Sequence, residues 1–154
     1  MAKSSSASAT PSRSPAAAGL KRLGLSPPHH TPLDPAEFVP AVGQGVLAVE
    51  ARQADRELLE LLRAVDDTRT RLAAVAERAF LARLGAGCHT AVAGHARPEG
   101  EALVLTGVVA SPDGSTVLRA SASGPATTGG RLGVTVAEEL LAKGAEALLD
   151  ASRG

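Results

Sequence analysis

The stretch of sequence that decides the fold is residues 90–121, TAVAGHARPEGEALVLTGVVASPDGSTVLRAS. Apolar and polar residues alternate along it with a period of two, which predicts β-strands over residues 90–97, 102–110 and 115–121. Glu99-Gly100 and the Ser-Pro-Asp-Gly of residues 111–114 are tight-turn sequences. Because connections this short join antiparallel neighbours, the stretch predicts a three-stranded antiparallel meander.

Helical patterns flank this meander on both sides. Upstream, Asp67 or Thr68 is suited to begin a helix, and Gly85 is suited to end it in the left-handed conformation. Downstream, a loop over residues 124–130 leads to one last helix. The apolar stripes of the two helices are Leu72, Val75, Ala76, Ala79 and Phe80, and then Leu132, Val136, Leu140, Leu141, Ala145 and Leu148. The elements predict an α+β fold over residues 67–151, with helices covering one face of the sheet.

The part of the chain before Asp67 differs from this α+β region in composition. Residues 1–15 are small, polar and punctuated by proline, so we expect them to be disordered. Their Ser, Arg and Lys content is also typical of a transit peptide, although a misplaced start is the favoured interpretation. The prolines of residues 26–35, SPPHHTPLDP, indicate a linker or hinge.

Two secondary-structure elements are expected between this linker and Asp67. Residues 46–49, VLAV, form a short apolar run and predict a buried strand. Asp55 then caps a helix whose apolar residues recur at helical spacing, namely Leu58, Leu61, Leu62 and Val65.

Composition excludes several classes of function. Lys+Arg 16 against Asp+Glu 16 gives a formal net charge of +0, so no basic face is expected for nucleic acid or for anionic lipid. Aromatic residues make up 1% of the chain, which argues against the stacking of bases on side chains. No apolar run approaches the roughly 20 residues that span a bilayer. A single cysteine excludes an internal disulfide and favours a cytoplasmic protein.

The single cysteine, Cys88, lies in the sequence LGAGCH between the predicted helix and the first strand. The glycines at 85 and 87 let the backbone turn sharply and leave the thiol uncrowded. Neighbouring His89 and Arg83 would lower the thiol pKa if they pointed toward it. The alternatives are an inert, small apolar residue and a redox-sensing thiol.

Three further patterns are less specific indicators of a functional site. Gly43-Gln44-Gly45 leads into a strand, so it is either an ordinary turn or a chain crossing with exposed backbone N–H groups. The arginines of the first predicted helix, Arg71, Arg78 and Arg83, are either a solvated face or an anion site. We predict no metal site, because Cys88 and the histidines match no closed ligand set; these histidines are His29, His30, His89 and His95.

Five phrases of the sequence, taken in order, resemble porphobilinogen deaminase (hydroxymethylbilane synthase) from about Ala16 to Leu149. They are AAAGLKRLGL, FVPAVGQGVLAVEAR, AERAFLARLGAGCHTAVAGHA, GVVASPDGS and LGVTVAEELLAKGAEALLD. The resemblance implies a transferase of tetrapyrrole biosynthesis that joins porphobilinogen units stepwise and releases ammonia each time. It implies a covalent dipyrromethane cofactor, held by Cys88 through a thioether. A polarisable thiolate suits the capture of an electrophilic methylene-pyrrole.

The resemblance also implies roles for other residues and a division into domains. Arg22 falls where the family pairs an arginine with pyrrole carboxylates, and Gln44 and Gly45 fall on a crossover beside the same cleft. Residues 16–40 would end the second α/β domain and include the hinge, and residues 41–66 would return to the first α/β domain. Residues 67–154 would form the complete cofactor-attachment domain.

On this reading the chain is the C-terminal portion of such an enzyme, without the aspartate that assists the reaction. We therefore expect it to be poorly active alone. The family is monomeric, but exposed apolar residues of the first 66 residues would favour self-association of this chain. The alternative from another class is a non-catalytic binding or dimerisation module, in which Cys88 stays unmodified.

Overall fold

The structure is a computed structural model that describes residues 17–87 and 90–152. The chain divides into two compact units, one ending at Leu33 and the other comprising Asp34–Gly154. The first unit contains the short helix α1 (Ala17–Arg22), whose last turn carries Lys21 and Arg22 and which buries none of its residues. The prolines of residues 27–35 follow it without regular structure, as the sequence predicts.

The second unit is built around one antiparallel sheet with the strand order β1-β2-β3. The strands are β1 (Val92–Glu99), β2 (Ala102–Ala110) and β3 (Val117–Pro125). Gly94 is paired with Gly107 across β1 and β2, and Thr106 is paired with Ser121 across β2 and β3. The predicted meander is therefore confirmed, with β1 and β3 shifted a few residues toward the C-terminus.

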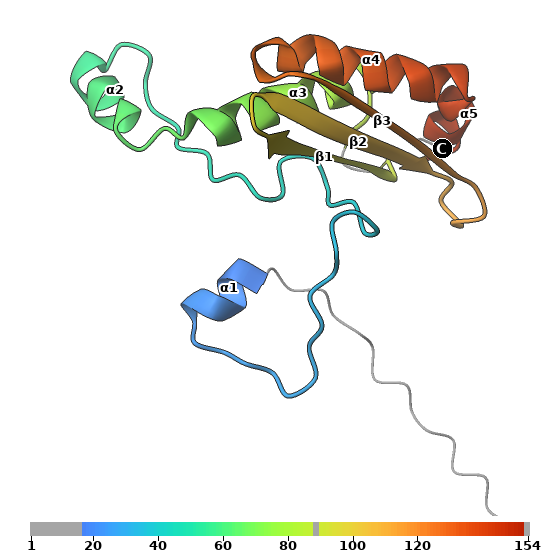
Figure 1. The fold of residues 1–154 in the computed structure, drawn as a ribbon, viewed down its shortest axis with the longest axis horizontal. Coiled ribbons are helices and arrows are strands. Elements are labelled where there is room, and N and C mark those ends of the chain that lie inside the picture. Colours follow the sequence, from blue (N-terminus) through green and yellow to red (C-terminus); the bar gives the residue numbers. More distant parts are fainter. Residues whose placement is uncertain (1–16, 88–89, 153–154) are drawn as a thin grey trace, which may run out of the picture. The chain divides into compact units, whose positions relative to one another are not determined.

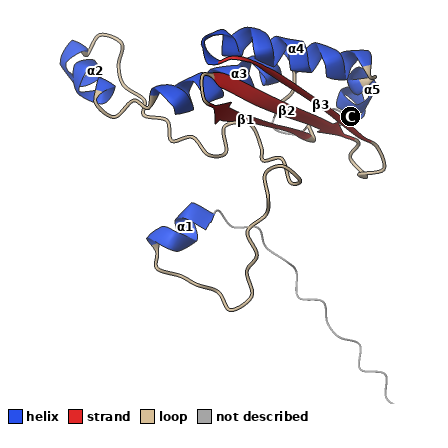
Figure 2. Ribbon diagram, viewed as in Figure 1, coloured by secondary structure: helices blue, strands red, loops and turns tan. Residues whose placement is uncertain are grey.

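Helices cover one face of this sheet, as Figure 1 and Figure 2 show. They are α3 (Thr68–Leu84), α4 (Gly129–Ala142) and α5 (Ala145–Ala151), with a short 3₁₀ turn, η1 (Ala126–Thr128), before α4. Asp67 caps α3 by accepting a 2.7 Å hydrogen bond from the N–H of Thr70, and Gly85 ends it with φ 61°. The two-layer α+β fold predicted from the sequence is confirmed.

The core is organised around Phe80, which is completely buried between α3 and the sheet. Its ring lies over the paired glycines of β1 and β2: a Cβ at Gly107 would come 2.5 Å from Phe80 Cε2, and one at Gly94 would come 3.0 Å from Cδ1. The two glycines thus form the slot that receives the ring. Leu105, Val136 and Leu140 are also buried in this core.

Three predictions of secondary structure and burial are wrong. Residues 46–49 form no strand, and Leu47 is 79% exposed, because no neighbouring strand within the described residues supplies hydrogen bonds. The last helix is two helices, because Gly144 (φ 95°) breaks it between α4 and α5. Val75 is 46% exposed, since the buried stripe of α3 instead includes Ala73 and Glu77.

The helix capped by Asp55 is confirmed as α2 (Arg56–Arg63), and Asp55 accepts a 3.1 Å hydrogen bond from the N–H of Leu58. As expected for a helix without a packing partner, none of its apolar residues is buried, and Leu61 is 67% exposed. No helix in residues 17–87 and 90–152 is long and apolar enough to cross a membrane.

Candidate functional site

The connection between α3 and β1 carries the predicted nucleophile. Gly85 ends the helix, and Thr90 turns back to donate hydrogen bonds to the carbonyl of Gly87, 2.6 Å from its Oγ1 and 3.1 Å from its backbone N. Cys88 and His89 lie outside the described residues. The described flanks of the loop, Gly85 and Gly87, are exposed to solvent, and a Cβ at Gly87 would meet no atom within 4 Å.

Gln44 and Gly45 lie in a turn formed by residues 42–45, and both are exposed. The turn is closed by backbone hydrogen bonds from Gln44 N–H to Ala41 O and from Val46 N–H to Gly43 O, each 3.0 Å long. Gly43 has φ 73°, a conformation that glycine adopts without steric cost. The sequence left two interpretations of Gly43-Gln44-Gly45 open, a turn and a chain crossing, and the structure shows a turn. The chain after this turn has no regular secondary structure and forms no strand.

This turn is attached to the free edge of β1. The N–H of Gly94 donates a 3.0 Å hydrogen bond to the carbonyl of Pro40, and Val42 packs against the core beside Gly94. Gly94 follows Cys88 by six residues in the sequence. The structure therefore places Gln44 and Gly45 on a turn that docks on the strand leading out of the Cys88 loop.

Sequence reasoning missed one residue of this region, Glu77. It is the one buried charged residue in the described part of the chain, at 6% exposure. Its carboxylate accepts hydrogen bonds from the N–H groups of Gly43 and Ala96, and Nδ1 of His95 lies 3.6 Å from Oε1. A signal was present, because Glu77 falls on the buried stripe of α3, three residues before Phe80 and four after Ala73.

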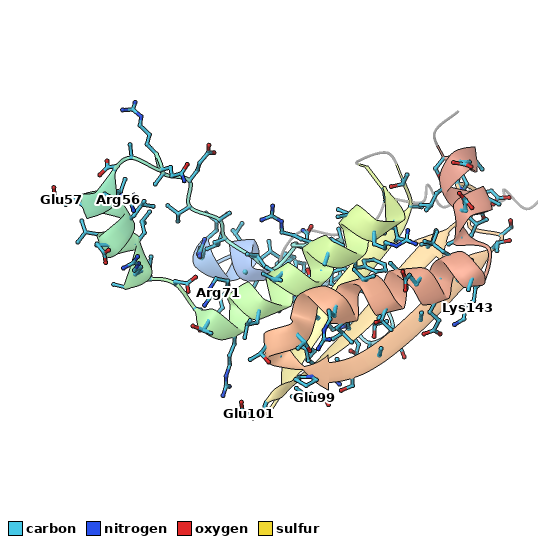
Figure 3. All side chains as sticks on the ribbon, turned by 90° about the horizontal axis from the view of Figure 1, so that it is seen from above. Arg56, Glu57, Arg71, Glu99, Glu101 and Lys143 are labelled. Carbon is cyan, nitrogen blue, oxygen red and sulfur yellow. The ribbon has the colours of Figure 1, made fainter. Side chains whose placement is uncertain are left out.

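The other charged side chains lie on the outside, and Figure 3 shows Arg71, Glu101 and Lys143 pointing away from the core. Arg71 pairs with Asp66 at 2.9 Å, and Arg83 lies 3.5 Å from Glu138. The two arginines stand 12 residues apart on α3, or about 18 Å along the helix axis. The helix arginines therefore form a solvated face, and they do not converge into an anion site.

Arg22, the predicted carboxylate partner, lies in the first unit at the end of α1 and is exposed. Because the Arg22 guanidinium is exposed, it can form bidentate hydrogen bonds to a carboxylate. Arg22 belongs to the first unit, whereas Gln44 and Gly45 belong to the second.

Two carboxylates with lowered pKa values serve the fold rather than this site. Hydrogen bonds donated by Thr70, from its hydroxyl and its backbone N–H, lower the pKa of the Asp67 carboxyl. In the β2–β3 loop, the Ser111 hydroxyl and then the N–H and hydroxyl of Ser115 lower the pKa of Asp113 to about 2. Both carboxyls are fully exposed.

Within the described ranges of the chain, neither a metal-binding cluster nor the hollow at the C-terminal end of α3 adds to the candidate site. Among the described residues, no group of three His, Cys, Asp or Glu side chains could hold a metal ion. A hollow of about 320 Å³ at the C-terminal end of α3 is lined by Arg83, Leu84, Leu141, Glu146, Leu149 and Asp150. Its charged lining is one guanidinium and two carboxylates, and it includes neither Gln44 nor Gly45.

Comparison with known protein families identifies two matches. Residues 71–142 match the family model described as porphobilinogen deaminase, C-terminal domain. Residues 15–60 match the model described as porphobilinogen deaminase, dipyrromethane cofactor binding domain. Arg22, Gln44 and Gly45 thus fall in the segment matched by the cofactor-binding model, whereas Cys88 falls in the segment matched by the C-terminal domain.

Comparison with individual curated proteins agrees. The chain is 50% identical over 134 residues to the porphobilinogen deaminase of Roseiflexus castenholzii, covering 87% of this chain and 44% of the relative. It is 43% identical over 134 residues to that of Coxiella burnetii, with the same two coverages. It is 42% identical over 135 residues to that of Alkaliphilus metalliredigens, covering 88% of this chain and 43% of the relative. The chain spans less than half the length of these relatives. Its α+β fold, its two collinear family matches and these identities show that it belongs to the porphobilinogen deaminase family.

Proposed function

We propose that this chain carries the cofactor-attachment function of a porphobilinogen deaminase, a transferase of tetrapyrrole biosynthesis whose substrate is porphobilinogen. The observation that carries the proposal is the docking of the Gln44–Gly45 turn on β1, the strand that follows the Cys88 loop. A turn from the segment matching the cofactor-binding model is thereby fixed to the domain that holds the one thiol of the chain.

Cys88 would hold dipyrromethane through a thioether, because the thiol is the strongest nucleophile among the side chains of this region. When bound, the group supplies the primer to which further pyrrole units are joined. Its acetate and propionate carboxylates call for cationic and N–H partners, which Arg22, the Gln44 amide and the Gly45 backbone would supply. We propose none of the described residues as the acid that assists the departure of ammonia.

The first test is the intact mass of the purified chain, measured before and after incubation with porphobilinogen or with the linear tetrapyrrole product. We expect a covalent addition of two pyrrole rings in the wild type and none in Cys88→Ser, because a serine hydroxyl is a much weaker nucleophile near neutral pH. The readout is an added mass and not a rate of turnover, which we expect to be low for these 154 residues alone.

His29→Ala serves as the matched control, because His29 lies in the proline-rich segment away from the turn and the loop. It should acquire the same added mass as the wild type. An unmodified Cys88 under conditions in which a longer relative loads the cofactor would favour the non-catalytic binding module. Reversible oxidation of Cys88 without an adduct would instead favour a redox-sensing thiol.

We also propose that the chain acts in the cytoplasm and associates with itself. The single cysteine supports the location, since disulfides are rare in reducing compartments. Self-association is supported by the exposed apolar side chains between the turn and α3, which include Leu47, Val49, Leu61 and Val65.

A further inference from the structure

The carboxylate of Glu77 joins two segments that are far apart in the sequence. Its Oε2 accepts a 2.7 Å hydrogen bond from Gly43 N–H, 34 residues upstream, and its Oε1 accepts a 2.8 Å hydrogen bond from Ala96 N–H, 19 residues downstream. Because the side chain is buried, water competes weakly for these bonds, and bonds to an ionised acceptor are stronger than neutral ones.

The chemistry of the site requires a carboxylate. Glu77 faces two N–H donors, and an ionised carboxylate presents two acceptor oxygens and no donor. A glutamine would offer one oxygen and would turn its NH₂ group toward the second N–H. One of the two backbone donors would then be left buried without an acceptor, which is costly in free energy.

The turn has few other attachments to the domain. Pro40 O accepts from Gly94 N–H before the turn, and Val42 packs on the core. After Gly43, the hydrogen bonds of Gln44 N–H and Val46 N–H stay inside the turn. Glu77 is therefore the last hydrogen-bonded attachment to the sheet and α3 that the structure shows before Gln44 and Gly45.

We propose that Glu77 is a positioning residue that fixes the turn of residues 42–45 to the free edge of β1, so that Gln44 and Gly45 are held beside the strand leading from the Cys88 loop. That Gln44 and Gly45 then bind a pyrrole carboxylate rests on the function proposed above. The attachment of the turn by Glu77 does not rest on that function, and it can be measured without ligand.

The test is amide hydrogen exchange of the full 154-residue chain, followed residue by residue by NMR in the wild type and in Glu77→Gln. We expect exchange to accelerate about ten- to a hundred-fold at whichever of Gly43 and Ala96 loses its acceptor, the factor that corresponds to losing one hydrogen bond to a charged acceptor. Exchange at Phe80 and Leu105, in the core, should stay unchanged. Glu138→Gln removes an exposed carboxylate from α4 and should leave Gly43 at the wild-type rate.

Two results would overturn the proposal: unchanged rates at both Gly43 and Ala96 in Glu77→Gln, or an equal acceleration at these two residues and at Phe80 and Leu105, which would indicate general destabilisation. Should Glu77→Gln fail to fold, Glu77→Asp gives the same readout, because its shorter side chain keeps the charge but cannot span both donors. A missing mass addition at Cys88 would count against the proposed function alone, since the exchange measurement uses no ligand.

Discussion

At the scale of single residues, α3 and α4 approach each other closely at Gly133. A Cβ at this position would clash with the carbonyl oxygen of Ala76 and would lie 2.7 Å from the backbone nitrogen of Phe80. Both atoms belong to the backbone of α3, so no side chain can move aside to relieve the clash. The two helices would have to separate, and the packing around Phe80 would loosen.

We therefore predict that Gly133→Ala destabilises the fold by about 1–3 kcal/mol, the usual cost of overpacking a core. Gly130→Ala is the matched control, because its Cβ would lie at an ordinary 3.9 Å from Val75 Cγ1. Alanine favours helix over glycine by up to ~1 kcal/mol, so this second variant should be neutral or stabilised. Urea denaturation measures both, and equal midpoints for the two variants would contradict the prediction.

Candidate site residues can be picked out of a sequence to the extent that their type or setting is unusual. Cys88 is the only thiol of the chain, and Gln44 stands between two glycines, so both attract attention in the sequence. Glu77 did not, because a glutamate in a helix is ordinarily solvated. Its function depends on N–H groups from residues 43 and 96, and only the folded chain brings these together.

At the scale of elements, local sequence patterns located the three strands and the helices α2 and α3 of the second unit, but they merged α4 and α5 into one helix. Caps at Asp55 and Asp67 and the stop at Gly85 were predictable, because each depends on a few neighbouring residues. The strand predicted over residues 46–49 was wrong because a strand requires a hydrogen-bonded neighbour, which the apolar run alone does not reveal.

The β2–β3 hairpin carries a pH-dependent element of its own. Asp113 accepts hydrogen bonds from Ser111 Oγ at 2.6 Å and from Ser115 N–H at 3.1 Å, and its pKa is lowered from 3.8 to about 2. A lowered pKa means that the folded loop favours the ionised carboxylate. Its contribution to stability is therefore fully present above about pH 4 and is lost as the pH falls toward 2.

We predict that the Cγ resonance of Asp113, followed by NMR, titrates with a midpoint near 2 in the wild type. Ser111→Ala removes the largest cause of the shift and should raise the midpoint toward 3.8, although not fully, because the Ser115 donors remain. Ser123→Ala, on β3 and outside the loop, should leave it unchanged. A wild-type midpoint near 3.8, or one insensitive to Ser111→Ala, would contradict this account.

At the scale of the whole molecule, the predicted site residues fall in two units. Arg22 belongs to the first, and Gln44, Gly45 and the Cys88 loop belong to the second. Periodicity predicted the sheet and its helices, whereas only the resemblance to a family pointed to Arg22, whose role stays a prediction. The docking of the turn on β1 is a tertiary feature that neither kind of reasoning predicted.

Several large apolar side chains between the turn and α3 are exposed. Leu47 is 79% exposed, Leu61 67% and Val65 72%. Burying a leucine side chain is worth about 1.5–3 kcal/mol, so covering several of them would drive association at moderate concentration. We predict that the chain forms dimers or larger species whose proportion rises with concentration in sedimentation velocity experiments.

The double variant Leu47→Ser/Leu61→Ser should weaken this association at least ten-fold, because two of the most exposed leucines no longer gain from burial. Val117→Ser is the matched control: Val117 is 60% exposed on β3, outside this apolar segment, and its loss should leave the association constant unchanged. If Val117→Ser weakened association as much as the double variant, the contact would involve the sheet instead. A wild-type chain that stays monomeric at high concentration would show that these side chains, though exposed, do not suffice to hold two copies together.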